Sequence, residues 1–221
     1  TLRLFCHVNF FNFKLMDFPI LSSLILLPSI GAVFLLFSKD HKSSNTVKYV
    51  ALFTSFVNFL ISIYLWYLFD PSTSSFQFVE KKEWLKEFAN YKVGVDGISI
   101  LFIILTTFIT PLCIISVNNT IKVRLRDFLI SILIMESVMI GVFCSLDLVV
   151  FYLFFEAGLI PMFLIIGIWG GARRVYSAFK FFLYTLLGSV LMLVAIISIY
   201  WISGTTDVTQ LYELGIDDKY Q

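Results

Sequence analysis

The sequence contains six apolar stretches, each close to 20 residues long and separated from the next by a polar segment. A hydrocarbon core of about 30 Å needs roughly 20 residues of helix, because an α-helix rises about 1.5 Å per residue. Each stretch must be helical in lipid, since no water is present there to satisfy open backbone groups. We therefore predict an all-α membrane protein with about six transmembrane helices, at residues 18–37, 49–69, 97–117, 128–146, 148–169 and 177–202.

The composition also indicates that lipid, not water, surrounds most of the chain. Of the 221 residues, 59% are hydrophobic and 14% are charged, which is more apolar surface than one soluble core of this size can hide. The formal net charge of +1 offers neither a basic face for nucleic acid nor an acidic face for a cationic partner. We expect residues 1–221 to form a single transmembrane domain that contacts lipid and binds no nucleic acid.

The polar segments between the spans differ in charge. The first, third and fifth are short and basic, whereas the fourth is the single residue Asp147. Short basic loops stay on the negative side of a membrane, so the three basic loops are expected to share that side. Their bases are Lys39, Lys42, Lys48, Lys122, Arg124, Arg126, Arg173 and Arg174.

The second polar segment is the longest connection and carries charges of both signs. In it, "FQFV" alternates in polarity and is followed by the charged run "EKKEWLKE", which fits a short strand or a segment at the membrane surface. We expect a short hairpin or an interfacial segment between the second and third helices. A solvated loop is the alternative interpretation.

Two acidic residues, Glu136 and Glu156, lie inside apolar spans, while the other acids lie in loops, tails or at span ends. A carboxylate near the middle of a membrane helix costs roughly 2.5 to 3.5 kcal/mol on insertion scales. Because the two spans are joined by almost no loop, they should run antiparallel, side by side. Glu136 is 11 residues before Asp147 and Glu156 is 9 after it, which gives depths of roughly 16 and 14 Å below the turn.

Two carboxyl groups at a similar depth in a low dielectric are expected to influence each other, so that at least one is protonated at neutral pH. Such a pair can relay protons. Pro161 strengthens this interpretation, because it frees the carbonyl of Ala157 beside Glu156 and favours a kink where water could bind. The alternative for either glutamate is a hydrogen bond that joins two helices.

Lys180 comes early in the sixth span, after Arg173 and Arg174. Lys180, Tyr184 and Gly188 repeat every four residues and predict one helix face that is wet and covered by protein. The alternative is a lysine whose side chain extends to the lipid headgroups. By helical rise, Lys180 lies about 15 Å from the level of Glu156, so that only a water chain could connect them.

Metal and cofactor sites are not indicated. The three cysteines are far apart, and the two histidines, His7 and His41, lie outside the apolar runs. This pattern fits no disulfide framework, zinc site or haem ligation. We expect no cofactor in this chain.

Two long strings resemble a known family. They are "DLVVFYLFFEAGLIPMFLIIGIWGGARRVYSAFKFFLYTLLGS" and "VGVDGISILFIILTTFITPLCIIS", with "DPSTSSFQFVE" ahead of the second. Together they resemble the subunit 4 family of proton-pumping NADH:ubiquinone oxidoreductase, respiratory complex I. The resemblance is continuous from about residue 70 to 206 and is looser before that. It implies the N-terminal part of an antiporter-like fold.

The resemblance also implies roles for individual residues. Glu156 matches the key protonatable glutamate of a proton half-channel, and Glu136 matches an accessory glutamate. Lys180 matches a lysine at the start of helix six, and the segment around residues 76–84 matches a hairpin that links neighbouring subunits. Redox cofactors and quinone belong to other subunits of that complex. The implied partners are therefore the other membrane-arm subunits.

One departure from the family concerns length. The family continues past the sixth span to a broken seventh helix, whose lysine modulates the glutamate matched by Glu156. This sequence stops at Gln221 after its sixth span. We expect a second polypeptide to carry the missing C-terminal helices, in a split arrangement of subunit 4.

The leading hypothesis is thus a non-redox membrane-arm subunit of NADH:ubiquinone oxidoreductase, with no independent enzyme activity. The alternative is a structural remnant that ties the membrane arm together without pumping, and a third hypothesis is an independent cation antiporter. The 25 phenylalanines, with abundant isoleucine and lysine, indicate A/T-rich coding. This favours the mitochondrial inner membrane, with a bacterial plasma membrane as the alternative.

Overall fold

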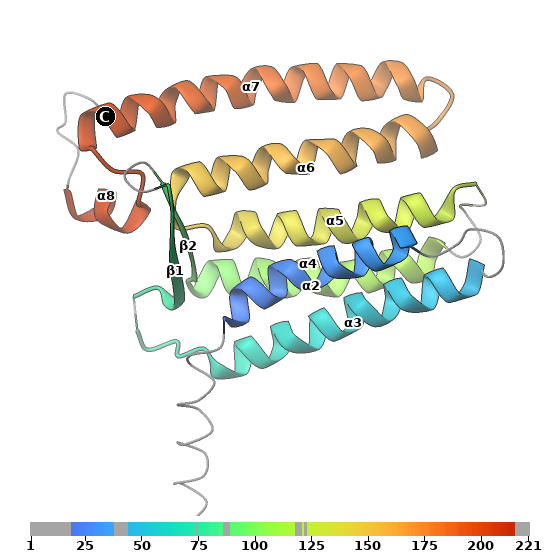
Figure 1. The fold of residues 1–221 in the computed structure, drawn as a ribbon, viewed down its shortest axis with the longest axis horizontal. Coiled ribbons are helices and arrows are strands. Elements are labelled where there is room, and N and C mark those ends of the chain that lie inside the picture. The colour runs from blue at the N-terminus through green and yellow to red at the C-terminus, as the bar shows by residue number, and fades with distance from the viewer. Residues whose placement is uncertain are drawn as a thin grey trace, which may run out of the picture.

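The computed structural model describes residues 19–37, 44–73, 75–85, 89–117, 121 and 123–214. Within them, six helices are long and apolar enough to cross a membrane, and Figure 1 shows them lying side by side. This confirms the predicted fold class. The helices are α2 Ile20–Phe37, α3 Ser44–Leu68, α4 Gly97–Ser116, α5 Leu125–Cys144, α6 Leu148–Trp169 and α7 Arg174–Ser203; β1 Gln77–Leu85, β2 Ala89–Val95 and α8 Val208–Leu214 complete the described elements.

Several helices extend beyond the apolar runs from which they were predicted. α3 starts at Ser44 and α5 at Leu125, so Lys48 and Arg126 lie near the N-termini of these helices and not in loops. Long basic side chains can reach the headgroups while their stems cover apolar surface, so a helix continues past the hydrocarbon. The predicted span at 18–37 begins one residue outside the described part of the chain.

α5 is the central helix of the bundle. It contacts α2, α3, α4 and α6, whereas α7 packs mainly against α6. The buried share of each apolar helix falls from 56% in α5 to 17% in α6 and 11% in α7, and Figure 1 shows α6 and α7 as successive outer layers. Glu136 therefore lies in the core, while Glu156 lies near an open edge.

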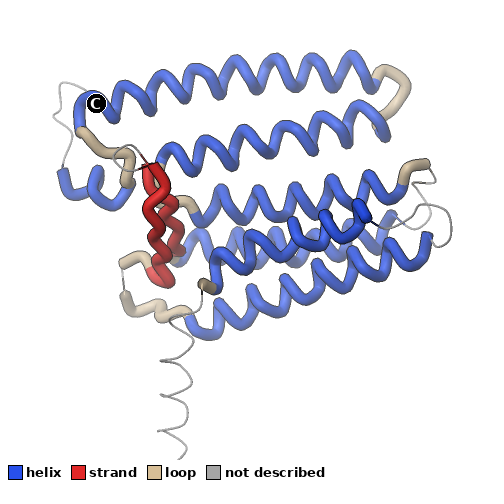
Figure 2. The backbone as a smooth tube through the Cα atoms, viewed as in Figure 1, coloured by secondary structure: helices blue, strands red, loops and turns tan. Residues whose placement is uncertain are grey.

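The connection between α3 and α4 is an antiparallel hairpin, which is one of the two forms that the sequence predicted. β1 and β2 pair from Gln77 with Val95 to Leu85 with Ala89. The register shifts after Gln77, where Phe78 has a positive φ of 53°. Figure 2 shows the hairpin crossing the ends of the helices, so it covers one end of the bundle.

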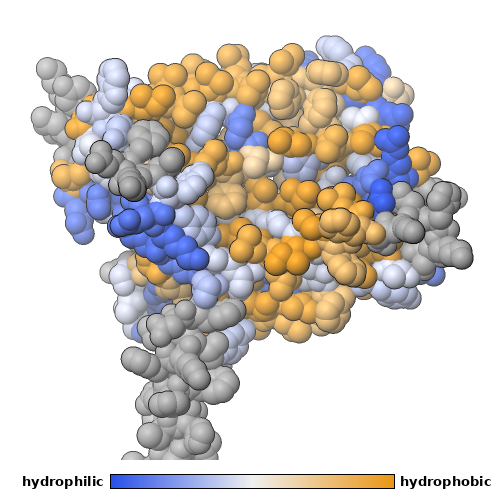
Figure 3. All heavy atoms as spheres, in the orientation of Figure 1, coloured by the Kyte–Doolittle hydropathy of each residue, from blue (hydrophilic) through white to orange (hydrophobic). Residues whose placement is uncertain are grey.

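The surface divides into bands that match a bilayer. In Figure 3, apolar residues form a belt over the middle of the helices, and hydrophilic residues gather at the hairpin end and at the opposite end. The opposite end carries Arg124, Arg126, Arg173 and Arg174 next to the termini of α5, α6 and α7. The described bases of the third and fifth loops therefore share one end of the bundle, and that this end faces the negative side of the membrane stays a prediction.

Backbone hydrogen bonds from β2 and from the segment after α7 hold the turn between α5 and α6. The backbone amide of Leu146 donates to the Lys92 carbonyl of β2 at 2.9 Å, and the amide of Leu148 donates to the Thr206 carbonyl at 2.9 Å. The amide of Val208 donates back to the Leu146 carbonyl at 2.9 Å. The turn is thus held between the hairpin and the segment that follows α7.

Candidate functional site

Glu136 is enclosed in the helix bundle. Its side chain is 2% exposed, and Asn58 of α3, which is fully buried, donates its side-chain amide to Glu136 Oε1 at 2.8 Å. Within the described ranges, Glu136 Oε2 and Asn58 Oδ1 are buried without a hydrogen-bond partner. Glu136 therefore faces α3, which the sequence analysis did not anticipate.

Glu156 lies in a different environment, on α6. Its side chain is half-buried, and its Oε2 atom is buried with no hydrogen-bond partner in the described part of the chain. Phe163 and Gly167 follow it by seven and eleven residues, so all three share one helix face. Phe163 contacts Phe179 of α7 at a centroid distance of 5.4 Å, and a Cβ added at Gly167 would lie 3.6 Å from Ala178 of α7. Glu156 thus lies on the side of α6 that faces α7.

The opposite side of α6 packs on α5. A Cβ added at Gly141 of α5 would lie 2.6 Å from Phe154, and one added at Gly158 would lie 3.5 Å from Val138. Phe154 and Gly158 are each two residues from Glu156, which is about 200° around a helix of 3.6 residues per turn. The structure therefore does not bring the two carboxyl groups face to face.

The predicted similarity in depth holds to about one helical turn. The contacts between Gly141 and Phe154 and between Gly158 and Val138 set the register of α5 against α6. In that register Glu136 and Glu156 differ by three to four residues, or about 5 Å along the axis. We expected the two carboxyl groups to interact directly because they lie at a similar depth, but the rotation of the helices turns them to different sides. A short loop fixes the relative depth of two helices but not which of their faces meet.

The register of α6 against α7 identifies the residues at the level of Glu156. Gly167 lies opposite Ala178, and Phe163 lies opposite Phe182. Continuing this antiparallel register places Glu156 opposite Ser189, which is 2% exposed and lies on the same α7 face as Ala178. The Ser189 hydroxyl donates to the Leu186 carbonyl at 3.0 Å. A buried hydroxyl oxygen is therefore present at the level of Glu156.

Lys180 is exposed and lies away from both glutamates. It is two residues from Ala178, so it lies on the far side of α7 from α6. The stripe predicted with it is also open: Tyr184 is 81% exposed, and a Cβ added at Gly188 would meet nothing within 4 Å among the described residues. The predicted protein cover of this face does not come from the described part of the chain.

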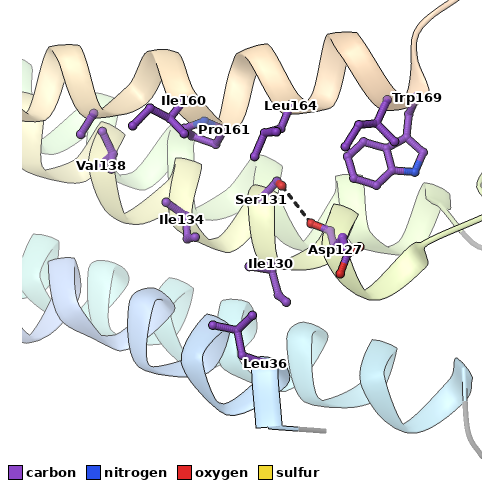
Figure 4. Close-up of a pocket in the computed structure, with 12 residues that line it drawn as sticks. Leu36, Asp127, Ile130, Ser131, Ile134, Val138, Ile160, Pro161, Leu164 and Trp169 are labelled. Atoms are coloured by element: carbon purple, nitrogen blue, oxygen red, sulfur yellow. Dashed lines mark hydrogen bonds between the residues drawn. The ribbon is translucent and has the colours of Figure 1, made fainter. Parts of the chain in front are cut away.

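Pro161 borders a cavity between α5 and α6. The cavity has a volume of about 400 Å³ and an apolar wall that includes Pro161, Ala157 and Val138, as Figure 4 shows for the labelled residues. Ser131 and Asp127 are its polar residues, and the Ser131 hydroxyl donates to the Asp127 carbonyl at 2.8 Å. The walls near Pro161 are apolar and Glu156 is not among them, so this cavity is not the water site that we expected between the Ala157 carbonyl and Glu156.

Asp147 begins α6 and joins three elements. It is 2% exposed, and its side chain accepts from the amide of Val149 at 2.9 Å, the amide of Asn90 at 3.2 Å and the hydroxyl of Thr206 at 2.9 Å. The sequence analysis treated this residue only as a turn. An aspartate directly before an apolar run is a helix N-cap signal, so this role of Asp147 could have been predicted from the sequence.

A second polar link lies beside Asp147. The Lys92 ammonium of β2 contacts the Asp207 carboxylate at 2.7 Å, with both side chains nearly buried, and Thr209 donates to Asp207 at 2.7 Å. Burial raises the pKa of Asp207, but the hydrogen bonds from Lys92 and Thr209 outweigh it and hold the pKa below the usual value. The segment after α7 is thus fixed to the hairpin.

Metal ligands are not clustered in the part of the chain that the structure describes. There, no group of three or more His, Cys, Asp or Glu side chains could hold an ion. Cys6, His7 and His41 lie outside the described residues.

Comparison with known proteins identifies relatives of this fold. The family described as "NADH:quinone oxidoreductase/Mrp antiporter, TM" matches residues 145–219. NADH-quinone oxidoreductase subunit M of Rhodobacter capsulatus is 56% identical over 169 residues, covering 76% of this chain and 33% of that protein. NADH-ubiquinone oxidoreductase chain 4 of Marchantia polymorpha is 44% identical over 203 residues, covering 91% of this chain and 41% of that protein.

A solved structure agrees with these relatives. Respiratory complex I from Thermus thermophilus with bound NADH contains a chain that is 27% identical, with a TM-score of 0.76, over 90% of this chain and 40% of that chain. This chain thus spans about two fifths or less of the length of these relatives. The shared sequence, the shared fold and the six membrane helices show that the chain is a multi-span membrane protein of the NADH-quinone oxidoreductase subunit M and chain 4 family, corresponding to its N-terminal part.

Proposed function

We propose that this chain is part of the membrane arm of a proton-translocating NADH:ubiquinone oxidoreductase and that Glu156 binds and releases the translocated protons. The observation that carries the proposal is the Glu156 Oε2 atom, which is buried in a membrane helix without a hydrogen-bond partner among the described residues. A carboxyl oxygen in that state gains from binding a proton or water. Because the Glu156 side chain is half-exposed, it can also exchange this proton with its surroundings.

The energies involved are consistent with this role. Placing an acidic residue at mid-membrane depth costs roughly 2.5 to 3.5 kcal/mol on insertion scales, and moving one charge against 100 mV requires about 2.3 kcal/mol. A change of a few kcal/mol in the surroundings of Glu156 is therefore enough to load or unload it. The family resemblance places the electron-transfer cofactors in other subunits, so we assign none to this chain.

Glu136 and Lys180 take secondary roles in this proposal. Glu136 is a second protonatable group, separated from Glu156 by the packed surfaces of α5 and α6. Lys180 lies on the exposed face of α7, where it is available to residues outside the described chain. Both assignments rest on position and on the family resemblance.

The partners follow from the exposed helix faces. Leu183, Leu187 and Leu191 of α7 are each more than 60% exposed, and such a face is covered by lipid or by further helices. We propose that further helices of the fold, supplied by a second polypeptide, and other membrane-arm subunits cover this face. Mass spectrometry of the purified complex tests this, and the absence of any chain with those helices would exclude it.

We place the protein in the mitochondrial inner membrane, with a bacterial plasma membrane as the alternative. The relatives include proteins named from both plants and bacteria. The phenylalanine-rich composition favours the mitochondrion. Fractionation of source cells, with detection of this chain by a specific antibody, distinguishes the two.

A structural role without pumping is the second candidate function. It is favoured by the polar contacts that join pairs of helices, such as Asn58 with Glu136 at 2.8 Å and Ser62 with Thr107 at 2.7 Å. The two functions differ in what Glu156→Gln does to the intact complex. Pumping predicts normal assembly with impaired turnover, whereas a structural role predicts loss of assembled complex. Glu156→Asp is the control, since it keeps a carboxyl group.

A further inference from the structure

The contact between Asn58 and Glu136 has an unusual pattern of hydrogen bonds. Both side chains are almost completely buried, and one hydrogen bond of 2.8 Å joins Asn58 Nδ2 to Glu136 Oε1. The remaining oxygen of each side chain is buried and, in the described part of the chain, lacks a partner. Two unsatisfied atoms thus belong to one pair of residues.

The neighbouring polar groups are already engaged. The Ser62 hydroxyl lies one turn along α3 and pairs with Thr107 at 2.7 Å, and the Ser55 hydroxyl donates to the Leu52 carbonyl at 3.1 Å. Ser137, next to Glu136, donates to the Ile25 carbonyl. None of these hydroxyls offers a spare proton to the Asn58–Glu136 pair.

A compensating charge is also distant. The titratable groups on the membrane helices packed against α5 are Lys48, Tyr49, Tyr64 and Tyr67 on α3, Cys113 on α4, and Tyr152 and Glu156 on α6; α2 carries none. Lys48 is ten residues from Asn58, or about 15 Å along the helix. Glu156 faces the other side of α6. Within the described helices, an ionised Glu136 therefore has no cation beside it.

The pattern of hydrogen bonds favours one protonation state of Glu136. An ionised carboxylate only accepts, so Glu136 Oε2 and Asn58 Oδ1 would both remain acceptors without a donor. A buried polar atom in that state costs about 1 to 3 kcal/mol, and more if it is charged. One proton on Oε2 supplies the donor that Asn58 Oδ1 lacks, so a single proton satisfies both atoms.

We propose that Glu136 is held as a neutral acid whose Oε2–H donates to Asn58 Oδ1, so that acid and amide are joined by two hydrogen bonds. Asn58 is then a positioning residue that retains the proton of Glu136. To release this proton, Glu136 must break the Oε2–H to Oδ1 bond, which leaves both of these buried oxygens without a donor. The inference deepens the proposed function by separating a retained proton at Glu136 from an exchanging proton at Glu156.

Infrared spectroscopy of the intact complex tests the pair directly. Protonated carboxylic acids give a C=O stretching band that shifts between H2O and D2O. We expect a band at neutral pH that disappears in Glu136→Gln and moves to higher frequency in Asn58→Leu, because the C=O and O–H of the acid lose their amide partner. Ser62→Ala is the matched control, since it removes a buried polar contact on the same helix and should leave the band unchanged.

The proposal is overturned if Glu136→Gln removes no acid band at neutral pH, or if Asn58→Leu leaves the band where it was. Should Asn58→Leu fail to assemble, Asn58→Ser keeps a small polar side chain that cannot form the two-bond pair and is expected to shift the band in the same direction; an unshifted band contradicts the pairing. These readouts do not require pumping. A complex that pumps fully with Glu156→Gln would refute the proposed function and leave this test intact.

Discussion

Replacing Asp147 with alanine should destabilise the start of α6 strongly. The side chain caps the helix through Val149 and also accepts from Asn90 and Thr206. A lost cap costs about 1 kcal/mol, and each lost hydrogen bond to a charged group costs about 1.5 kcal/mol or more. The sum is about 4 kcal/mol, a large part of the 5 to 15 kcal/mol that stabilises a typical domain.

The assay is thermal unfolding of the detergent-solubilised complex, followed by loss of this chain from the assembly. For a domain of this size, 4 kcal/mol corresponds to a drop in Tm on the order of 10 °C. Asp127→Ala is the control, because Asp127 is 44% exposed and its contact with Arg126 is 3.5 Å long, so its loss should cost less than about 1 kcal/mol. Equal Tm shifts for Asp147→Ala and Asp127→Ala would show that the contacts of Asp147 do not stabilise the start of α6.

Three further changes test the packing and the surface. Asp207→Asn breaks the nearly buried pair with Lys92 and should cost about 3 kcal/mol. Because the pKa of Asp207 is lowered on folding, the stabilisation by Asp207 is complete at neutral pH and is lost as pH falls below about 4. The Tm values of variant and wild type should therefore converge at low pH, and a constant difference would contradict the ion pair. Gly141→Leu places side-chain atoms where even a Cβ lies 2.6 Å from Phe154 of α6 and should cost about 1 to 3 kcal/mol. Gly171→Ala, whose Cβ would meet no described residue within 4 Å, should leave Tm unchanged. Lys180→Met should lower Tm less than Asp207→Asn does, because the Lys180 side chain is exposed in the described part of the chain; a fall as large as that of Asp207→Asn would contradict this.

The number and position of the membrane helices were predictable because each depends on a local property. A run of about 20 apolar residues is sufficient to identify a span, and alternating polarity identified the hairpin. The ends of α3 and α5 were less predictable, because Lys48 and Arg126 continue a helix beyond the hydrocarbon.

The orientation of Glu156 could not be predicted from the same information. Depth follows from the rise per residue, but rotation depends on which small residues let two helices approach. Here Gly141 and Gly158 bring Phe154 and Val138 into the contact between α5 and α6. That contact turns Glu156 towards α7, and no local pattern specifies it.

The partner of Glu136 left a weaker signal in the sequence. Asn58 is a polar residue in the middle of an apolar span, with Ser55 and Ser62 on a similar face, and such residues point into a bundle. The docking of the segment after α7 had no comparable signal. It depends on Asp147, Lys92 and Asp207, which are distant in sequence and meet only in the folded chain.

The most direct test of the proposed function is the ratio of protons translocated to electrons transferred by the purified complex in sealed vesicles. We predict that Glu156→Gln leaves the amount of assembled complex unchanged and lowers this ratio or stops turnover. Glu156→Asp should retain most of the wild-type ratio, since a carboxyl remains at the site. A Glu156→Gln complex that turns over at the wild-type rate with an undiminished ratio would contradict the role assigned to Glu156.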